Sequence, residues 1–272
     1  RTRLKIAARA MAARGRPAAR FHAVHGANVR LDASRTRATR VRSFAHGLCF
    51  SQEPLPPGHV FLVEIEEKEL GWCGHLRVGL TAHDPQSLEA VPEYSLPDLV
   101  NMGDTWVFAI TRSHNRAAPG GGDEARDPPS DPLLALRRAR IPCDTLVGRS
   151  RPGRYSHILD ELYRLNVLPA TARRSRIGVL YVPRPDGTAD MHIIINGEDM
   201  GACARHLPAA RPLYAVVDVF ASTKSVRVIP VEYGFPSLQT LCRMVIQQHI
   251  VHRLAIEGLD LPPPLKNFCQ HE

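Results

Sequence analysis

The chain has 272 residues, of which 44% are apolar and 23% are charged. This composition is typical of a globular protein with room for one large domain and an appendage, or for two ordinary domains. No segment approaches the run of about 18 apolar residues that a membrane-spanning helix needs, so we expect a cytoplasmic protein without membrane insertion.

The formal net charge of +8 is concentrated at the start of the chain. Residues 1–20 hold seven of the 35 basic side chains and no acidic one, which leaves 28 basic against 27 acidic residues in the rest. A nucleic-acid-binding domain gathers its charge on a folded face, so we expect no nucleic-acid partner. We predict that this Ala/Arg-rich tail is disordered. A role like that of a transit peptide stays open.

From Phe21 onward, short runs of alternating apolar residues are separated by Gly and Pro turns. This period of two predicts β-strands, and many short strands with few helices predict an all-β sandwich. Asn196-Gly197 after one run predicts a tight hairpin, because both positions of a type I′ turn need a positive φ. The predicted strands lie at 61–65, 76–80, 106–110, 177–182, 191–195, 213–221 and 226–229.

Two stretches interrupt this pattern. Residues 117–132 contain three consecutive glycines with prolines and acids, and we predict a low-complexity surface loop there. Residues 155–165 place apolar side chains on one helical face, which predicts a helix packed on the sandwich.

The last 36 residues change to a helical period. Ser237 is a suitable N-cap, and apolar residues follow on one face. A second helical piece is expected at 251–257, before Gly258, and prolines 262–264 suit the first turn of a third. A segment this short rarely folds alone, so its apolar face needs a partner, either the chain's own sandwich or another protein. The apolar positions of the first helix are Leu238, Leu241, Cys242, Val245, Ile246 and Ile250.

The run SLQTLCRMVI at 237–246 resembles the elongin-binding part of a SOCS box. The resemblance implies that Leu238, Leu241, Cys242, Val245 and Ile246 contact elongin C. The downstream run LPPPLKNF at 261–268 resembles the cullin-selecting part, although Pro263 stands where an aliphatic residue is usual. It implies that Leu261, Pro262, Pro264, Leu265 and Phe268 contact a cullin, with the fifth type favoured.

Residues 21–233 resemble the neuralized homology repeat. The resemblance implies a mainly β, SPRY-like or concanavalin-like antiparallel β-sandwich for substrate recognition, followed by a small α-helical SOCS box at 237–272. The segments that carry it are FH at 21–22, HGANV at 25–29, GLCFS at 47–51, WCGHLRVGLT at 72–81, LPDL at 96–99, NGEDMG at 196–201 and PLYAVVDVF at 212–220.

Together the two resemblances imply a substrate adaptor of a ubiquitin ligase that contains elongins B and C, a cullin and its RING protein. They also imply action in muscle differentiation, with β-catenin as a candidate substrate. The alternative is a stand-alone sandwich that binds a protein or a glycan and whose C-terminal helices cap its own core.

Catalytic chemistry finds little support in the residue pattern. The six cysteines lie far apart without any C-x-x-C pair, which favours reduced thiols and excludes a RING within this chain. His22 and His25 have no further ligands at zinc spacing, so we expect no metal, no cofactor and no catalytic residue. We interpret Trp72 and Trp106 as core residues. Loops around 47–57, 83–97 and 196–207 are candidates for substrate binding.

Overall fold

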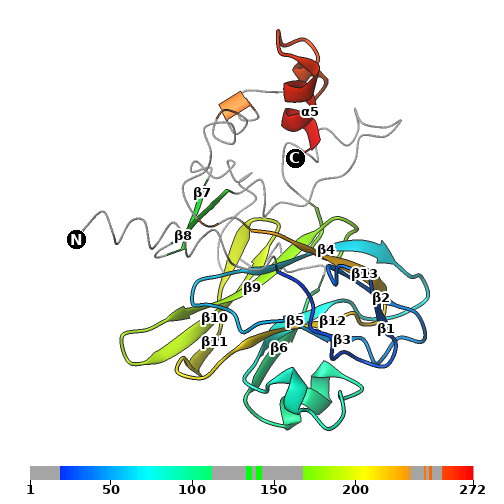
Figure 1. Cartoon of the computed structure of the whole chain (residues 1–272), viewed down its shortest axis with the longest axis vertical. Helices are drawn as coiled ribbons and strands as arrows, with labels where there is room; N and C mark the ends of the chain where they lie inside the picture. The colour runs from blue at the N-terminus through cyan, green and yellow to red at the C-terminus, as the bar shows by residue number, and fades with distance from the viewer. Residues whose placement is uncertain are drawn as a thin grey trace, which may run out of the picture.

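Two antiparallel β-sheets form the body of the protein in the computed structural model (Figure 1). The structure describes residues 19–111, 133–136, 139–142, 168–231, 233, 242, 245–246 and 253–271. The elements are β1 (Val29–Leu31), β2 (Arg37–Arg40), β3 (Leu48–Phe50), β4 (Phe61–Lys68), β5 (Arg77–Thr81), η1 (Pro85–Ser87), η2 (Ser95–Leu99), β6 (Thr105–Ala109), β7 (Leu133–Leu136), β8 (Ala139–Pro142), β9 (Arg176–Pro183), β10 (Thr188–Ile195), β11 (Glu198–Pro208), β12 (Tyr214–Asp218), β13 (Thr223–Ile229), η4 (Arg253–Ile256) and α5 (Pro263–His271).

The larger sheet has seven strands in the order β1-β2-β13-β4-β9-β10-β11, and the smaller has four in the order β3-β12-β5-β6. Strands β7 and β8 form a separate hairpin. Alternate residues of each strand enter the core between the sheets, because successive side chains of a strand point to opposite faces. Val63 and Ile65 from the larger sheet thus pack in one cluster with Val78, Leu80 and Val217 from the smaller. The predicted antiparallel β-sandwich is confirmed.

The outer faces of both sheets are also partly apolar and are covered by connections. Leu99 and its neighbours in and around η2 pack on Leu48, Phe50 and Val216 of the smaller sheet. Tyr233, after β13, packs with Leu62 and its neighbours on the larger sheet. The Tyr233 hydroxyl accepts from the backbone N–H of Val60 at 2.5 Å and donates to its carbonyl at 3.1 Å, so the chain leaves the sandwich at a fixed point.

The predicted hairpin at Asn196-Gly197 is confirmed, since these residues have φ of 47° and 86° and connect β10 to β11. The prediction of a loop over residues 196–207 is wrong beyond this turn, because residues 198–208 form β11. That strand is the edge of the larger sheet, and bulges interrupt its pairing with β10, so its side chains show no clean alternation.

The helix predicted at 155–165 and the loop predicted at 117–132 lie outside the described residues, as do residues 1–18 of the predicted tail 1–20. After Tyr233, Cys242, Val245 and Ile246 are helical. The piece predicted at 251–257 is a short 3-10 turn, η4, in its described part. Helix α5 begins at Pro263, as the proline pattern predicts. Figure 1 shows α5 set apart from both sheets.

Candidate interaction surfaces

The described residues of the predicted elongin-binding helix expose apolar surface. Cys242 is exposed, Val245 is 54% exposed, and Ile246 is partly buried. Leu238 and Leu241 lie outside the described residues. An apolar helical face that keeps Val245 in solvent differs from a core helix, whose apolar positions are buried.

The predicted cullin-binding segment is also largely in solvent. Leu261 is partly buried, Pro262 and Pro264 are exposed, and Leu265 is 39% exposed. The backbone of Phe268 lies within α5, whereas its side chain lies outside the described part. Ile256 and Cys269 are buried, and η4 contacts α5. The segment thus buries a small apolar centre and presents Leu265 outward.

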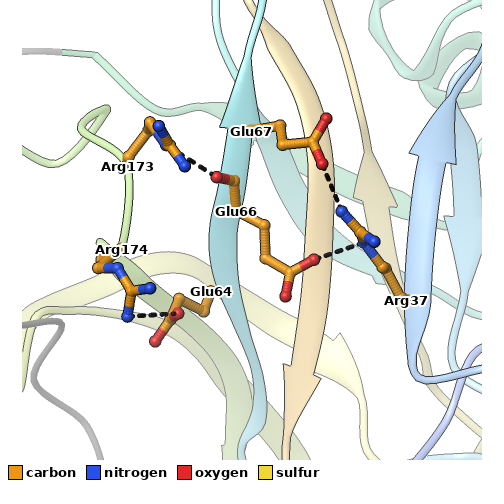
Figure 2. Close-up of a pocket in the computed structure, with 6 residues that line it drawn as sticks. All are labelled: Arg37, Glu64, Glu66, Glu67, Arg173 and Arg174. Atoms are coloured by element: carbon orange, nitrogen blue, oxygen red, sulfur yellow. Dashed lines mark hydrogen bonds and ion pairs between the residues drawn. The ribbon is translucent and has the colours of Figure 1, made fainter. Parts of the chain in front are cut away.

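A pocket of about 170 Å³ on the larger sheet is lined only by charged side chains (Figure 2). Glu66 is the extra residue of a β-bulge, since Ile65 pairs with Val226 and Glu67 with Ser225. Arg37 lies 2.6 Å from Glu66 and also binds Glu67, while Arg176 lies 2.9 Å from Glu64. Each of these three carboxylates therefore has an arginine partner, and these ion pairs around the pocket join three strands, β2, β4 and β9.

Four aromatic rings meet where β2, β4 and β12 end. Phe44 is central, with ring centroids 5.0 Å from Trp72, 6.4 Å from Tyr94 and 6.1 Å from Phe220. We call these four residues the aromatic surface. Trp72 is 41% exposed, and its neighbour Leu70 is 95% exposed. The prediction that Trp72 is a core residue is wrong, because the β4–β5 connection carries it beyond the end of the sheets; Trp106 does pack, partly buried, against the core.

A buried ion pair supports the aromatic surface from behind. The Arg77 guanidinium lies 3.5 Å from the centroid of the Phe220 ring and donates to the carbonyl of Leu96 at 3.1 Å. It also lies 3.4 Å from a carboxylate oxygen of Asp218, whose side chain is 1% exposed. The same oxygen accepts from the backbone N–H and the hydroxyl of Ser95, at 3.2 and 2.6 Å. Residues far apart in sequence thereby fix the position of Tyr94.

Burial raises the pKa of Asp218 above its ordinary value of 3.8, against the opposing effects of Ser95 and Arg77. Between the unfolded and folded pKa values the folded state binds more protons, so this group's contribution to stability is present below the unfolded pKa and is lost as pH rises through the folded pKa. We predict that the unfolding free energy of the wild type, minus that of Asp218→Asn, falls as pH rises from 4, by at most about 1.4 kcal/mol per unit. Urea titrations of both proteins between pH 4 and 8 would measure this difference in unfolding free energy. A difference that rises with pH would contradict a raised pKa for Asp218.

Other chemistry-bearing groups are few in the described part of the chain. No set of three or more His, Cys, Asp or Glu side chains there could hold a metal ion. Cys49 is buried, and burial raises the pKa of its thiol, which disfavours the nucleophilic thiolate. No described helix has the length and apolar character to cross a bilayer.

The sequence profile of the Neuralized domain matches residues 21–230, and that of the SOCS box matches residues 234–270. The chain therefore belongs to the Neuralized family, with a SOCS box after the β-sandwich. Over 94% of its length it is 72% identical to Neuralized-like protein 2 of Homo sapiens, covering 93% of that protein, and it is 70% identical to the Mus musculus protein of the same name.

More distant similarities agree with this placement. Over 34% of this chain and 18% of the other protein, it is 43% identical to E3 ubiquitin-protein ligase NEURL1B of Mus musculus, so the family includes ubiquitin ligases. The crystal structure of the Drosophila melanogaster neuralized NHR1 domain matches 78% of this chain and 98% of that domain, with a TM-score of 0.54 and 20% identity. That likeness confirms the fold of the sandwich.

Proposed function

We propose that this chain is a non-catalytic adaptor of a cullin-type ubiquitin ligase. In this proposal the sandwich, residues 21–233, binds the substrate, and residues 237–272 bind the ligase core, with residues 1–20 as a basic tail. The observation that carries the proposal is the SOCS-box match at 234–270, which coincides with exposed apolar residues on the C-terminal helices.

The chemistry of the C-terminal residues suits elongin C, accompanied by elongin B. Burying an aliphatic side chain such as Val245 stabilises an interface by roughly 1.5–3 kcal/mol before the costs of association. A few such anchors are enough for a stable complex. The small side chain of Cys242 permits close approach of the partner's backbone. Leu238, Leu241 and Ile246 complete the proposed contact, by the likeness to SOCS boxes.

The second half of the segment is assigned to a cullin, with the fifth type favoured, and its RING protein. Leu261, Pro262, Pro264, Leu265 and Phe268 form the proposed contact, and the exposure of Leu265 supports it. Cytoplasmic action in muscle differentiation, with β-catenin as a candidate substrate, is proposed from the likeness to the human and mouse relatives alone.

Co-expression of the full chain with elongins B and C tests the adaptor assignment. We predict that Val245→Asp, and the pair Leu238→Pro with Cys242→Phe, lower elongin recovery roughly tenfold or more, because a charge, a broken helix or an oversized side chain disrupts the apolar contact. Met102→Asp is the matched control, since Met102 is 49% exposed on the sandwich. Leu265→Asp should retain elongin and lose the cullin.

The competing assignment is a stand-alone binding sandwich capped by its own C-terminal helices. It predicts that elongins never co-purify with the full chain and that the chain truncated after Tyr233 unfolds. Equal recovery of elongin by the wild type and Val245→Asp would refute the adaptor assignment. The exposure of Val245 favours the adaptor, because a helix that caps a core buries its apolar face.

A further inference from the structure

The end of the sandwich that carries the aromatic surface exposes large apolar side chains from two separate connections. Leu70 and Trp72 lie between β4 and β5, and Val41, 45% exposed, follows β2. The pairing of β13 with β4 and with β2 brings the ends of these strands to one level. Contiguous exposed apolar groups on a protein surface mark interaction sites, and aromatic residues are enriched at such sites.

The connections that build this surface are tied to one another by hydrogen bonds. The carbonyl of Phe44 accepts from the backbone N–H of Ala221 at 3.1 Å, and the carbonyl of Glu93 accepts from His46 at 3.0 Å. The hydroxyl of Ser222 donates to the carbonyl of Gly74 at 2.7 Å. These hydrogen bonds hold the connections that carry the rings in fixed positions. A preorganised surface loses less conformational entropy when it binds a ligand.

Close packing beneath the Phe220 ring also holds the aromatic surface in place. Gly74 has a φ of 102°, and a Cβ there would lie 2.8 Å from the ring of Phe220. Behind the ring, Arg77 is held by Asp218, as described above, so its positive charge is compensated inside the protein. These contacts fix the position of the Phe220 ring, while Trp72 stays 41% exposed.

The charge beside the rings is acidic on the Tyr94 side. The Glu93 side chain accepts a hydrogen bond from the Tyr94 hydroxyl, and together with the nearby charge of Asp98 it raises the pKa of Tyr94. Glu93 is 45% exposed. The faces of aromatic rings attract cations as well. A ligand that places a cation next to an apolar group therefore complements this surface.

We propose that the aromatic surface, with Leu70 beside it, is the substrate-docking surface, and that it binds a short segment with an aromatic or aliphatic anchor next to lysine or arginine. The anchor packs against Trp72 and Leu70, and the cation lies near Glu93. This inference rests on the proposed adaptor function, because that function gives the sandwich a protein substrate.

Defined peptides test the chemistry directly. The probes are fluorescently labelled ten-residue Gly/Ser peptides with a central Phe or Ala, flanked by two lysines or by two glutamates. Binding to the full chain is measured by fluorescence anisotropy. We expect the Phe–Lys peptide to bind most tightly, and replacement of its Phe by Ala, or of its lysines by glutamates, to weaken binding on the order of tenfold.

Variants locate the binding on the molecule. Leu70→Asp and Trp72→Ala should each weaken the Phe–Lys peptide by on the order of tenfold, whereas Met102→Asp should not. Met102 is a fair control because its exposure is similar to that of Trp72 and it lies three residues before Thr105. Thr105 pairs with Thr81 at the far end of β5, about 13 Å from Arg77. Glu93→Lys should reverse the preference between lysine and glutamate flanks.

The outcomes separate this inference from the adaptor assignment. Leu70→Asp should retain elongin, so a variant that loses peptide binding and keeps elongin supports the inference. If the wild type binds the peptide but recovers no elongin, only the adaptor assignment fails.

Three results would overturn the inference. One is stronger binding of glutamate-flanked peptides, which would make Arg42, exposed two residues before Phe44, the dominant charge. Another is equal weakening by Met102→Asp. The third is a dimer that Leu70→Asp dissolves, which would make a second copy the occupant.

Discussion

Replacing Asp218 by alanine is expected to lower the free energy of unfolding by about 3–5 kcal/mol, the usual cost of removing one partner of a buried ion pair. The change leaves the Arg77 guanidinium, only 14% exposed, without its carboxylate. It also leaves the buried N–H and hydroxyl of Ser95 without their acceptor. Urea unfolding at pH 7, monitored by circular dichroism, measures the loss.

Two further variants show whether the cost comes from the orphaned groups. Asp218→Asn retains an acceptor oxygen and should lose less than Asp218→Ala. Asp190→Ala removes a carboxylate from a surface ion pair with Arg184, 34% exposed, and should cost less than about 1 kcal/mol. If Asp218→Ala is no more damaging than Asp190→Ala, the buried pair does not hold this end of the sandwich together.

The contacts of Asp218 also connect the stability of the sandwich to peptide binding by the aromatic surface. Asp218 holds Ser95 next to Tyr94, and Arg77 next to Phe220, so its loss releases two of the four rings of the aromatic surface. We expect a stability defect at Asp218 to be accompanied by a defect in peptide binding, whereas Leu70→Asp changes binding alone. Leu70, at 95% exposed, makes little contact with the core that its replacement could disturb.

Local patterns in the sequence were sufficient to predict the strands that line the core. The run at 177–182 lies within β9 and that at 191–195 within β10, because alternation is strong where one face of a strand is buried. The turn at Asn196-Gly197 was predictable for an equally local reason. Strand β11 was not, because an edge strand with bulges leaves most of its residues partly exposed.

The features that depend on distant contacts could not be predicted. Ser95 and Asp218 are 123 residues apart, and neither residue type signals a buried network by itself. The pattern favoured a core position for Trp72, since tryptophan is usually buried, and only the path of the β4–β5 connection brings it into solvent. The helical period after Ser237 predicted the helical state of Cys242, Val245 and Ile246, while their contacts with elongin remain a prediction.

Replacing Gly79 by alanine is expected to destabilise the protein by about 3 kcal/mol or more, which is at or beyond the upper range of overpacking. Gly79 pairs with Val107 across β5 and β6, and a Cβ there would lie 1.9 Å from the carbonyl oxygen of Trp106. Backbone atoms of a paired strand cannot move aside as a side chain can, so the two strands must separate. Thermal and urea unfolding would measure the loss.

Gly187→Ala is the matched control, because Gly187 has a φ of 83° with no atom within 4 Å of the added Cβ. Only the left-handed backbone penalty, about 1–2 kcal/mol, should apply there. Equal losses at the two glycines would mean that β5 and β6 approach less closely than described. Since Arg77 lies two residues from Gly79 on β5, separation of the strands should also move the guanidinium beneath Phe220. Gly79→Ala is therefore expected to weaken peptide binding as well, and Gly187→Ala is not.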